Sequence, residues 1–297
     1  MTADWRFGTR GWQRLDAIYP ARTRPSDQLS VYATHASVVE AENFFSGIPK
    51  PERVQALVEQ SPDGFKFDVL AFGGLTLYQR RPGLSDLGTK SWKDVAVEPP
   101  DVLFEDYCAS LEPLCTAGRL GAVILQFPPW FESGSAGREY LERIREQMPM
   151  IPLAAEFRHP TWTVPVNRDL TLETLIELEI GLIVADFPMG TDEWMPPIDT
   201  VTVDDVAVFR LHGQNVSGWA RTLVSPVEPV SYTYSADEIS LWVDRVRAVS
   251  REVDEVHLLM GTGPTDAALV AGRLLVEAVE AAEESESRWG YEPESIS

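Results

Sequence analysis

The segment Ala155–Trp162, which reads AEFRHPTW, carries the highest density of residues able to do chemistry. Glu156 and Arg158 lie two residues apart, so on a β-strand both side chains point to the same face. His159 follows directly, and Pro160 stiffens the chain after it. A carboxylate, a guanidinium and an imidazole this close together could bind an anion or transfer a proton.

Charged and polar residues also end the other apolar, strand-like segments. Because burying an unpaired charge is costly, we expect acids and bases at these ends to pair with one another. Parallel strands bring such ends to one face, where ligands bind. Residues predicted to act in catalysis are Glu156, Asp186, His212 and Glu40. Residues predicted to bind substrate are Arg10, Trp12, Lys66, Gln126, Arg158, His159, Trp162 and Arg210.

Two kinds of site are open at these strand ends. Glu156, Asp186 and His212 offer oxygen and imidazole ligands of the kind that Mn, Mg, Fe or Zn prefer. Arg158 and Arg210 instead offer paired donors for a phosphate or a carboxylate. Cationic and acidic groups nearly balance in this set, which favours an internally paired network. We therefore predict an anion near the two arginines and no tightly bound metal, and the sequence assigns no cofactor.

Strand-like runs alternate with helix-like runs along the chain, a pattern typical of parallel βα units. There are eight such strand-like runs. Eight strands close a (β/α)8 barrel, which takes ~250 residues. We therefore predict a single-domain α/β protein with a (β/α)8 TIM barrel, and an open doubly wound sheet is the alternative. The runs are Trp5–Thr9, Val38–Phe44, Phe65–Ala71, Ala122–Phe127, Leu153–Arg158, Leu182–Asp186, Val206–His212 and Val256–Met260.

The chain shows no internal repeat and no linker that would divide it. We predict one barrel domain over residues 1–282 and an acidic, disordered tail over residues 283–297. Residues 73–100 are rich in Gly, Pro, Asp and Ser, which predicts a long loop of functional importance.

The chain is strongly acidic, with 46 Asp and Glu against 25 Lys and Arg and a net charge of −21. Such a surface repels itself at low salt, so we interpret it as an adaptation to a saline cytoplasm, with codon bias as the alternative. It also disfavours binding to nucleic acid or to a membrane surface. No apolar run approaches the ~20 residues that span a bilayer. We expect a cytoplasmic protein.

Several segments, in the same order along the chain, resemble motifs of the DUF72 (YecE-like) family. Gly8–Trp12 is similar to the family's opening G-T-S-G-W, and Leu125–Phe131 to its Q-[FL]-P-P-x-F element. Ala155–Trp162 resembles its E-F-R-H-P-[ST]-W signature, and Arg210–Gly213 its seventh strand. The resemblance covers residues 6–279 and implies a barrel fold. It implies no established reaction, although the barrels of endonuclease IV and xylose isomerase are similar in fold.

The chain also departs from the family's pattern at two strand ends. Many members have N-S-T-F-Y after the second strand, where this chain has Glu42–Ser46. Members end the eighth strand in F-N-N, where this chain reads Leu259–Gly261. The missing asparagines remove polar groups from the expected site, which predicts that an activity of the family could be altered or lost in this chain.

The sequence favours an enzyme of hydrolase-like but unassigned class. We expect it to act by hydrolysis or proton transfer on a small phosphorylated or polyhydroxyl substrate at the carboxyl-terminal face of the barrel. One alternative is a non-catalytic barrel that binds an anionic metabolite. Another is a metal-dependent enzyme resembling endonuclease IV or xylose isomerase. The expected partner is a small molecule, and the sequence does not predict the oligomeric state.

Overall fold

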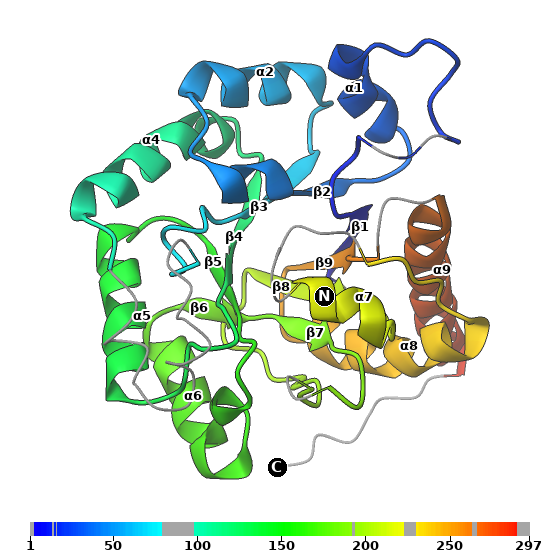
Figure 1. Ribbon diagram of the computed structural model, residues 1–297. Helices are drawn as coiled ribbons and strands as arrows, with labels where there is room; N and C mark the ends of the chain where they lie inside the picture. The colour runs from blue at the N-terminus through cyan, green and yellow to red at the C-terminus, as the bar shows by residue number, and fades with distance from the viewer. Residues whose placement is uncertain are drawn as a thin grey trace.

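The computed structural model describes residues 3–13, 15, 17–78, 98–191, 194–222, 230–262 and 266–289. All strands pair in parallel, in two sheets (Figure 1). The first sheet has the order β1 (Asp4–Thr9), β9 (Glu255–Met260), β8 (Val206–Leu211), β7 (Val184–Asp186). The second has the order β2 (Val38–Ala41), β3 (Lys66–Leu70), β4 (Leu120–Gln126), β5 (Leu153–Glu156), β6 (Ile180–Leu182).

The two sheets adjoin at both of their edges. At one edge, Arg10 forms an isolated parallel bridge with Glu40. At the other, Ile183 alone separates β6 from β7, and its N–H donates to the carbonyl of Ala155 at 3.0 Å. The arrangement is an α/β fold consistent with a TIM-barrel-like architecture.

The predicted closed eight-stranded barrel needs one correction, because the strands are hydrogen-bonded as separate sheets of four and five strands. The predicted single strand Leu182–Asp186 forms the division. The chain before Ile183 pairs with β5, and the chain after it pairs with β8. One segment therefore supplies two short strands with different partners.

Helices cover the outer faces of both sheets (Figure 1). The sequence sets their starts: Pro51 occupies a first turn, and Ser235 accepts a hydrogen bond from the Glu238 N–H in a capping box. The α-helices are α1 (Gln28–Tyr32), α2 (Pro51–Gln60), α4 (Asp101–Thr116), α5 (Ser135–Gln147), α6 (Pro165–Glu177), α7 (Val216–Thr222), α8 (Ala236–Ser250) and α9 (Asp266–Trp289). Short 3-10 turns are η1 (Pro25–Asp27), η2 (Glu42–Ser46) and η3 (Pro160–Trp162).

Strand alternation separates the outer core from the interior between the sheets. In β8, Phe209 faces outward and meets the Trp242 ring of α8 edge-on, with centroids 6.4 Å apart. Val208 and Arg210 point the other way, into the interior. The interior therefore holds an apolar layer with polar side chains above it, at the carboxyl ends of the strands.

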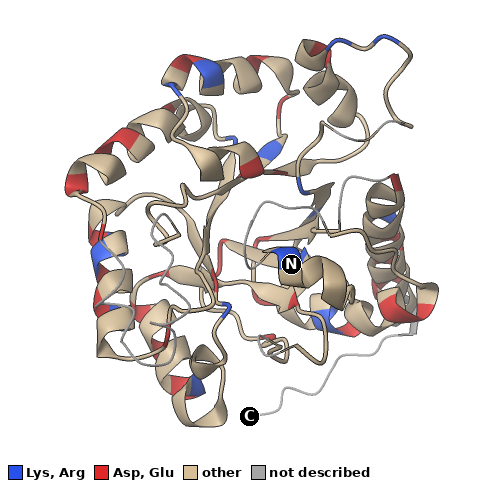
Figure 2. Ribbon diagram, viewed as in Figure 1, with Lys and Arg blue, Asp and Glu red and all other residues tan. Residues whose placement is uncertain are grey.

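The structure can be compared with three expectations from the sequence: the end of the domain, the long loop and the absence of a membrane span. The last helix continues to Trp289, past the predicted domain end at residue 282, and residues 290–297 lie outside the described residues. Residues 79–97 of the predicted long loop also lie outside them. None of the described helices is long and apolar enough to cross a membrane. Figure 2 shows Asp and Glu on most of the outer helices, with fewer Lys and Arg between them.

Candidate functional site

Arg210 joins four strands at the centre of a buried polar network. Its Nε and Nη2 donate to the two carboxylate oxygens of Glu40, at 3.0 and 2.7 Å. Its Nη1 donates to Glu156 at 2.5 Å and to Gln126 at 3.1 Å. Burial alone would lower the pKa of Arg210, but Glu156 and Glu40 outweigh burial and raise it. The guanidinium is therefore a fixed positive charge between the sheets.

Glu156, at the end of β5, accepts hydrogen bonds on both carboxylate oxygens. Arg158 donates through Nε to Oε1 at 2.8 Å, while Arg210 and His212 share Oε2. Burial alone would raise the pKa of Glu156, but Arg210, His212 and Arg158 lower it well below the ordinary carboxyl value. The carboxylate is thus ionised at neutral pH and serves better as an anchor than as a base.

His212 lies 2.9 Å from Glu156 through its Nε2 atom. Burial lowers the pKa of His212 to about 4, although Glu156 acts to raise it. The ring is therefore neutral at pH 7, and pairing with an ionised carboxylate places its proton on Nε2 and leaves a lone pair on Nδ1. Phe187 stacks on the ring with centroids 5.8 Å apart. A Cβ atom at Gly261 would fall 2.8 Å from Nδ1, so only glycine leaves this nitrogen clear.

Arg158 is fully buried and extends the network toward α7. Its Nη2 donates to Gln126 at 2.9 Å, and its guanidinium lies 4.6 Å from the ring centroid of Trp219, a cation–π distance. Within the described part of the chain, Nη1 makes one long hydrogen bond, to Thr222 at 3.5 Å. This end of Arg158 therefore keeps donor capacity for a ligand.

Arg10 completes the network at the junction of the two sheets. Its Nε lies 3.0 Å from Glu42 and 3.6 Å from Glu40. The network thus contains three arginines and three glutamates. Such a balance is what makes buried charges tolerable. The pairing of acids with bases follows the expectation from the sequence, and the binding and catalytic roles of these residues stay predictions.

Asp186 lies apart from this network. It ends β7, and its carboxylate accepts hydrogen bonds from Gln214 and from the Tyr234 hydroxyl, both at 2.5 Å. Burial raises its pKa. The described residues contain no group of three or more His, Cys, Asp or Glu arranged to hold a metal. The structure therefore brings Glu156 and His212 together without Asp186, and the absence of a tightly bound metal stays a prediction.

Lys66, which was predicted to bind substrate, lies away from the Arg210 network. It is the first residue of β3, and its Nζ lies 3.7 Å from Glu255, the first residue of β9. The polar network lies at the carboxyl ends of the strands. A residue that starts a parallel strand is displaced from that face by the length of the strand.

A second buried charge cluster lies nearer the amino ends of the strands. His257 places Nδ1 at 2.9 Å from both Asp68 oxygens and Nε2 at 3.1 Å from Glu255. Burial alone would lower the pKa of His257, but Asp68 and Glu255 raise it to about 9. The doubly hydrogen-bonded imidazolium joins β9 to β3.

The structure shows packing contacts for three predicted substrate-binding residues: Trp162, Trp12 and His159. Trp162 is fully buried and stacks on Phe157 with centroids 4.1 Å apart, in the core outside the sheets. Trp12 belongs to the same apolar core. His159 binds Thr161 through Nδ1 at 2.7 Å and caps the turn. Strand alternation directs Phe157 and its partner Trp162 to the face opposite Glu156 and Arg158.

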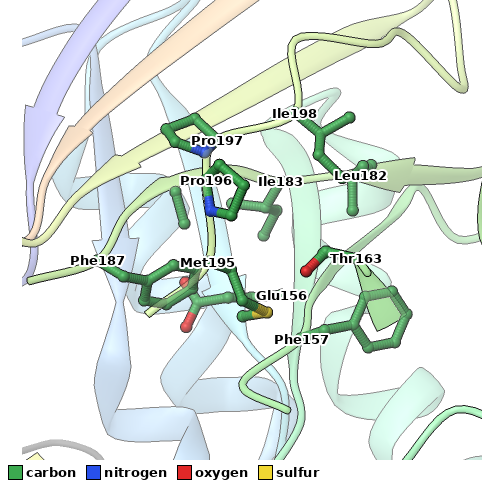
Figure 3. A pocket seen from close by; sticks show the side chains of 11 residues that line it. Glu156, Phe157, Thr163, Leu182, Ile183, Phe187, Met195, Pro196, Pro197 and Ile198 are labelled. Atoms are coloured by element: carbon green, nitrogen blue, oxygen red, sulfur yellow. The ribbon is translucent and has the colours of Figure 1, made fainter. Parts of the chain in front are cut away.

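Sequence reasoning missed three neighbours of the network: Tyr78, Trp219 and Thr222. Tyr78 accepts a hydrogen bond from Gln126 at 3.4 Å, and the other two contact Arg158. All three lie in segments that follow a strand, and their position after a strand is the signal that could have found them. An apolar pocket beside Glu156 was missed as well (Figure 3).

Comparisons with known proteins agree with this architecture. Residues 6–294 match the DUF72 family, described as proteins of unknown function. The UPF0759 protein YunF of Bacillus subtilis (strain 168) is 26% identical, with 92% of this chain and 94% of that protein covered. A DUF72 family protein of Enterococcus faecalis V583 superposes with a TM-score of 0.77 at 23% identity, over 94% of this chain and 98% of that chain. One of Thermotoga maritima MSB8 gives 0.70 at 26% identity, over 95% and 99%. The chain belongs to the DUF72 family.

Proposed function

We propose that the protein is an enzyme that binds a small phosphorylated or polyhydroxyl substrate at the carboxyl ends of its strands and transfers a proton to or from it. The observation that carries this proposal is the contact of 2.9 Å between His212 and a Glu156 carboxylate braced by two arginines. Hydrolysis of the substrate is the reaction class that this arrangement supports best, because it needs a base to activate water.

His212 would supply the base through Nδ1. Glu156 holds the Nε2 proton, which fixes the ring orientation and the tautomer, and it would stabilise the imidazolium formed when Nδ1 takes a proton. A pKa of about 4 makes the buried imidazole a weak base in the absence of ligand. A negatively charged substrate beside the ring would raise that pKa toward the range in which bases work efficiently.

Arg158 would anchor the anionic group of the substrate. Its Nη1 retains donor capacity, and its other nitrogens are held by Glu156 and Gln126, so the guanidinium is pre-oriented. We test this with inorganic phosphate, measured by isothermal titration calorimetry. Binding to the wild-type chain is expected, and Arg158→Lys should weaken it about tenfold because planar paired donors are lost. Arg24→Lys, an exposed arginine, is the matched control and should leave binding unchanged.

The catalytic part of the proposal needs its own measurement. We expect slow hydrolysis of a small phosphomonoester such as 4-nitrophenyl phosphate, lost in His212→Gln while phosphate binding remains. A chain that does not bind phosphate contradicts the proposal as a whole.

A non-catalytic barrel that binds an anionic metabolite is the second candidate. Both carboxylate oxygens of Glu40 and of Glu156 already accept hydrogen bonds. The two acids therefore act as supports for the arginines, which favours a binding protein. Phosphate binding with no hydrolysis in the wild-type chain, and equal binding by His212→Gln, would select this candidate over the enzyme.

A further inference from the structure

An apolar pocket adjoins the Glu156–His212 pair. Its interior offers about 20 Å³, which is space for one to two groups of the size of a water molecule. Apart from Glu156 and Thr163, its wall consists of Phe, Leu, Ile, Ala, Met and Pro side chains from β6, from β7, from Ile183 between them, and from the segments that follow β5 and β7 (Figure 3). Among the described residues that line it, none carries a positive charge, so the wall is suited to an apolar group.

The pocket and the polar network share two residues. Glu156 lines the pocket and accepts the hydrogen bond from His212. Phe187 lines the pocket and stacks on the His212 ring. The pocket therefore borders the polar network at Glu156, and Phe187 joins its apolar wall to the His212 ring. The wall is preformed, because Met195 and Ile198 are only 3% and 9% exposed and are therefore held by packing.

We infer that the ligand carries a short apolar substituent next to its anionic group, and that this pocket receives the substituent. The inference rests on the proposed function and deepens it by naming the class: phosphate monoesters of short alkyl alcohols or compounds of that shape. Transfer of one methylene from water to an apolar site raises affinity about fourfold. Short substituents should gain this factor and longer ones should not, because the pocket is small.

The test is a titration series on the full chain with inorganic phosphate, methyl phosphate, ethyl phosphate and butyl phosphate. Affinity should rise from phosphate through ethyl phosphate by about fourfold per carbon, and butyl phosphate should gain nothing further. Equal affinities across the series, with inorganic phosphate bound, would overturn this inference and leave the proposed function standing. No binding of any of the four would overturn both.

Two substitutions locate the effect in the pocket. Ala185→Leu, on β7, fills the pocket and should abolish the gain from alkyl groups while inorganic phosphate binds as before. Met195→Ala, after β7, enlarges the pocket and should move the best substituent to butyl. Because they change the preference in opposite directions from different segments, either variant alone suffices if the other does not fold.

The neighbouring Trp194→Ala is the matched control. Trp194 is 42% exposed and does not line the pocket. The affinities of Trp194→Ala for the four phosphate compounds should equal those of the wild-type chain. A gain from alkyl groups that persists unchanged in both Ala185→Leu and Met195→Ala would place the apolar contact elsewhere and overturn the inference.

Discussion

Glu156 is the residue on which the orientation of the network depends most. It is the common acceptor for Arg158, Arg210 and His212, and it is at most 1% exposed. Removing its charge would take away a negative charge that the buried guanidinium groups of Arg158 and Arg210 share. A buried ion pair contributes little over an apolar replacement, but breaking one by removing a single partner is strongly destabilising.

Glu156→Gln should therefore lower the free energy of unfolding by about 3–5 kcal/mol, measured by urea denaturation. Glu132→Gln is the matched control, because Glu132 is 52% exposed and lies 4.0 Å from His159. The free energy of unfolding of Glu132→Gln should differ from that of the wild-type chain by no more than about 0.5 kcal/mol. A loss for Glu156→Gln no larger than that of the control would show that the network does not hold the fold together.

Gly261 determines whether Nδ1 of His212 stays clear. A methyl group there would lie 2.8 Å from Nδ1, closer than carbon and nitrogen approach. Gly261→Ala should therefore cost about 1–3 kcal/mol of stability and displace the ring. Gly47→Ala, where nothing lies within 4 Å and the backbone is extended, should be neutral. Thermal unfolding and the chemical shifts of the His212 ring measure both effects, and equal melting temperatures for the two variants would contradict this account.

The residue at this position also bears on the departure from the family's pattern. The chain reads Leu259-Met260-Gly261 where the family was expected to read F-N-N. An asparagine at Gly261 would meet His212 in the same way as alanine. The glycine is therefore suited to a site in which the imidazole of His212 occupies this space.

At the scale of elements, the Asp68–His257–Glu255 cluster joins β3 to β9 across the interior. The pKa of His257 is raised from 6.5 to about 9, so the folded chain binds a proton that the unfolded chain releases in this range. The resulting stability is fully present below pH 6.5 and is lost as the pH rises through 9. The hydrogen bond from His257 and the ion pair with Arg6 lower the pKa of Glu255 from 4.5 to about 2, so its contribution is present above pH 4.5 and is lost as the pH falls to 2.

The free energy of unfolding should fall on the order of 3 kcal/mol between pH 6.5 and 9. Urea denaturation across this range measures the slope, and His257→Gln should remove it. His35→Gln, a partly exposed histidine outside the cluster, should keep it. A wild-type stability that is flat over this range would contradict the proposed imidazolium.

Much of the element pattern was predictable because it depends on local chemistry. The capping box of Ser235 and Glu238 and the sheet-facing position of Trp242 on α8 follow from spacing alone. The convergence of Arg210 and Glu156 followed from alternation within strands. The division of Leu182–Asp186 into β6 and β7 could not be predicted, because it depends on which strand the backbone pairs with.

The site residues divide in the same way. The sequence predicted which polar residues belong to strands. It did not show that Lys66 is the first residue of β3 and so lies at the amino-terminal end of the strands. Trp162 was predicted to bind substrate, and only the fold places it in the core. The pocket beside Glu156 depends on Met195 and Ile198, which come from a segment without a sequence motif. Tertiary contacts of this kind carry no local signal.

At the scale of the whole molecule, charge is distributed unequally between interior and surface. The Arg210 network is balanced within itself, with three arginines against three glutamates. The chain as a whole carries −21. The excess of negative charge therefore lies outside this network, and Figure 2 shows acidic residues along the outer helices. Mutual repulsion among exposed acids destabilises the compact state and is screened by salt, whereas buried pairs are screened far less.

The melting temperature should consequently rise as KCl increases from low to molar concentration. The Debye length falls from ~30 Å at 0.01 M to ~3 Å at 1 M, so repulsion between neighbouring helices is removed over this range. Sucrose at matched osmolality is the control, because it is excluded from protein surfaces without screening charge. Most of the rise should occur by ~0.1–0.2 M KCl if screening is the cause, since the Debye length is then already ~8–10 Å. A melting temperature that falls steadily with KCl, or a rise reproduced in full by sucrose, would contradict the view that surface repulsion limits the stability of this chain.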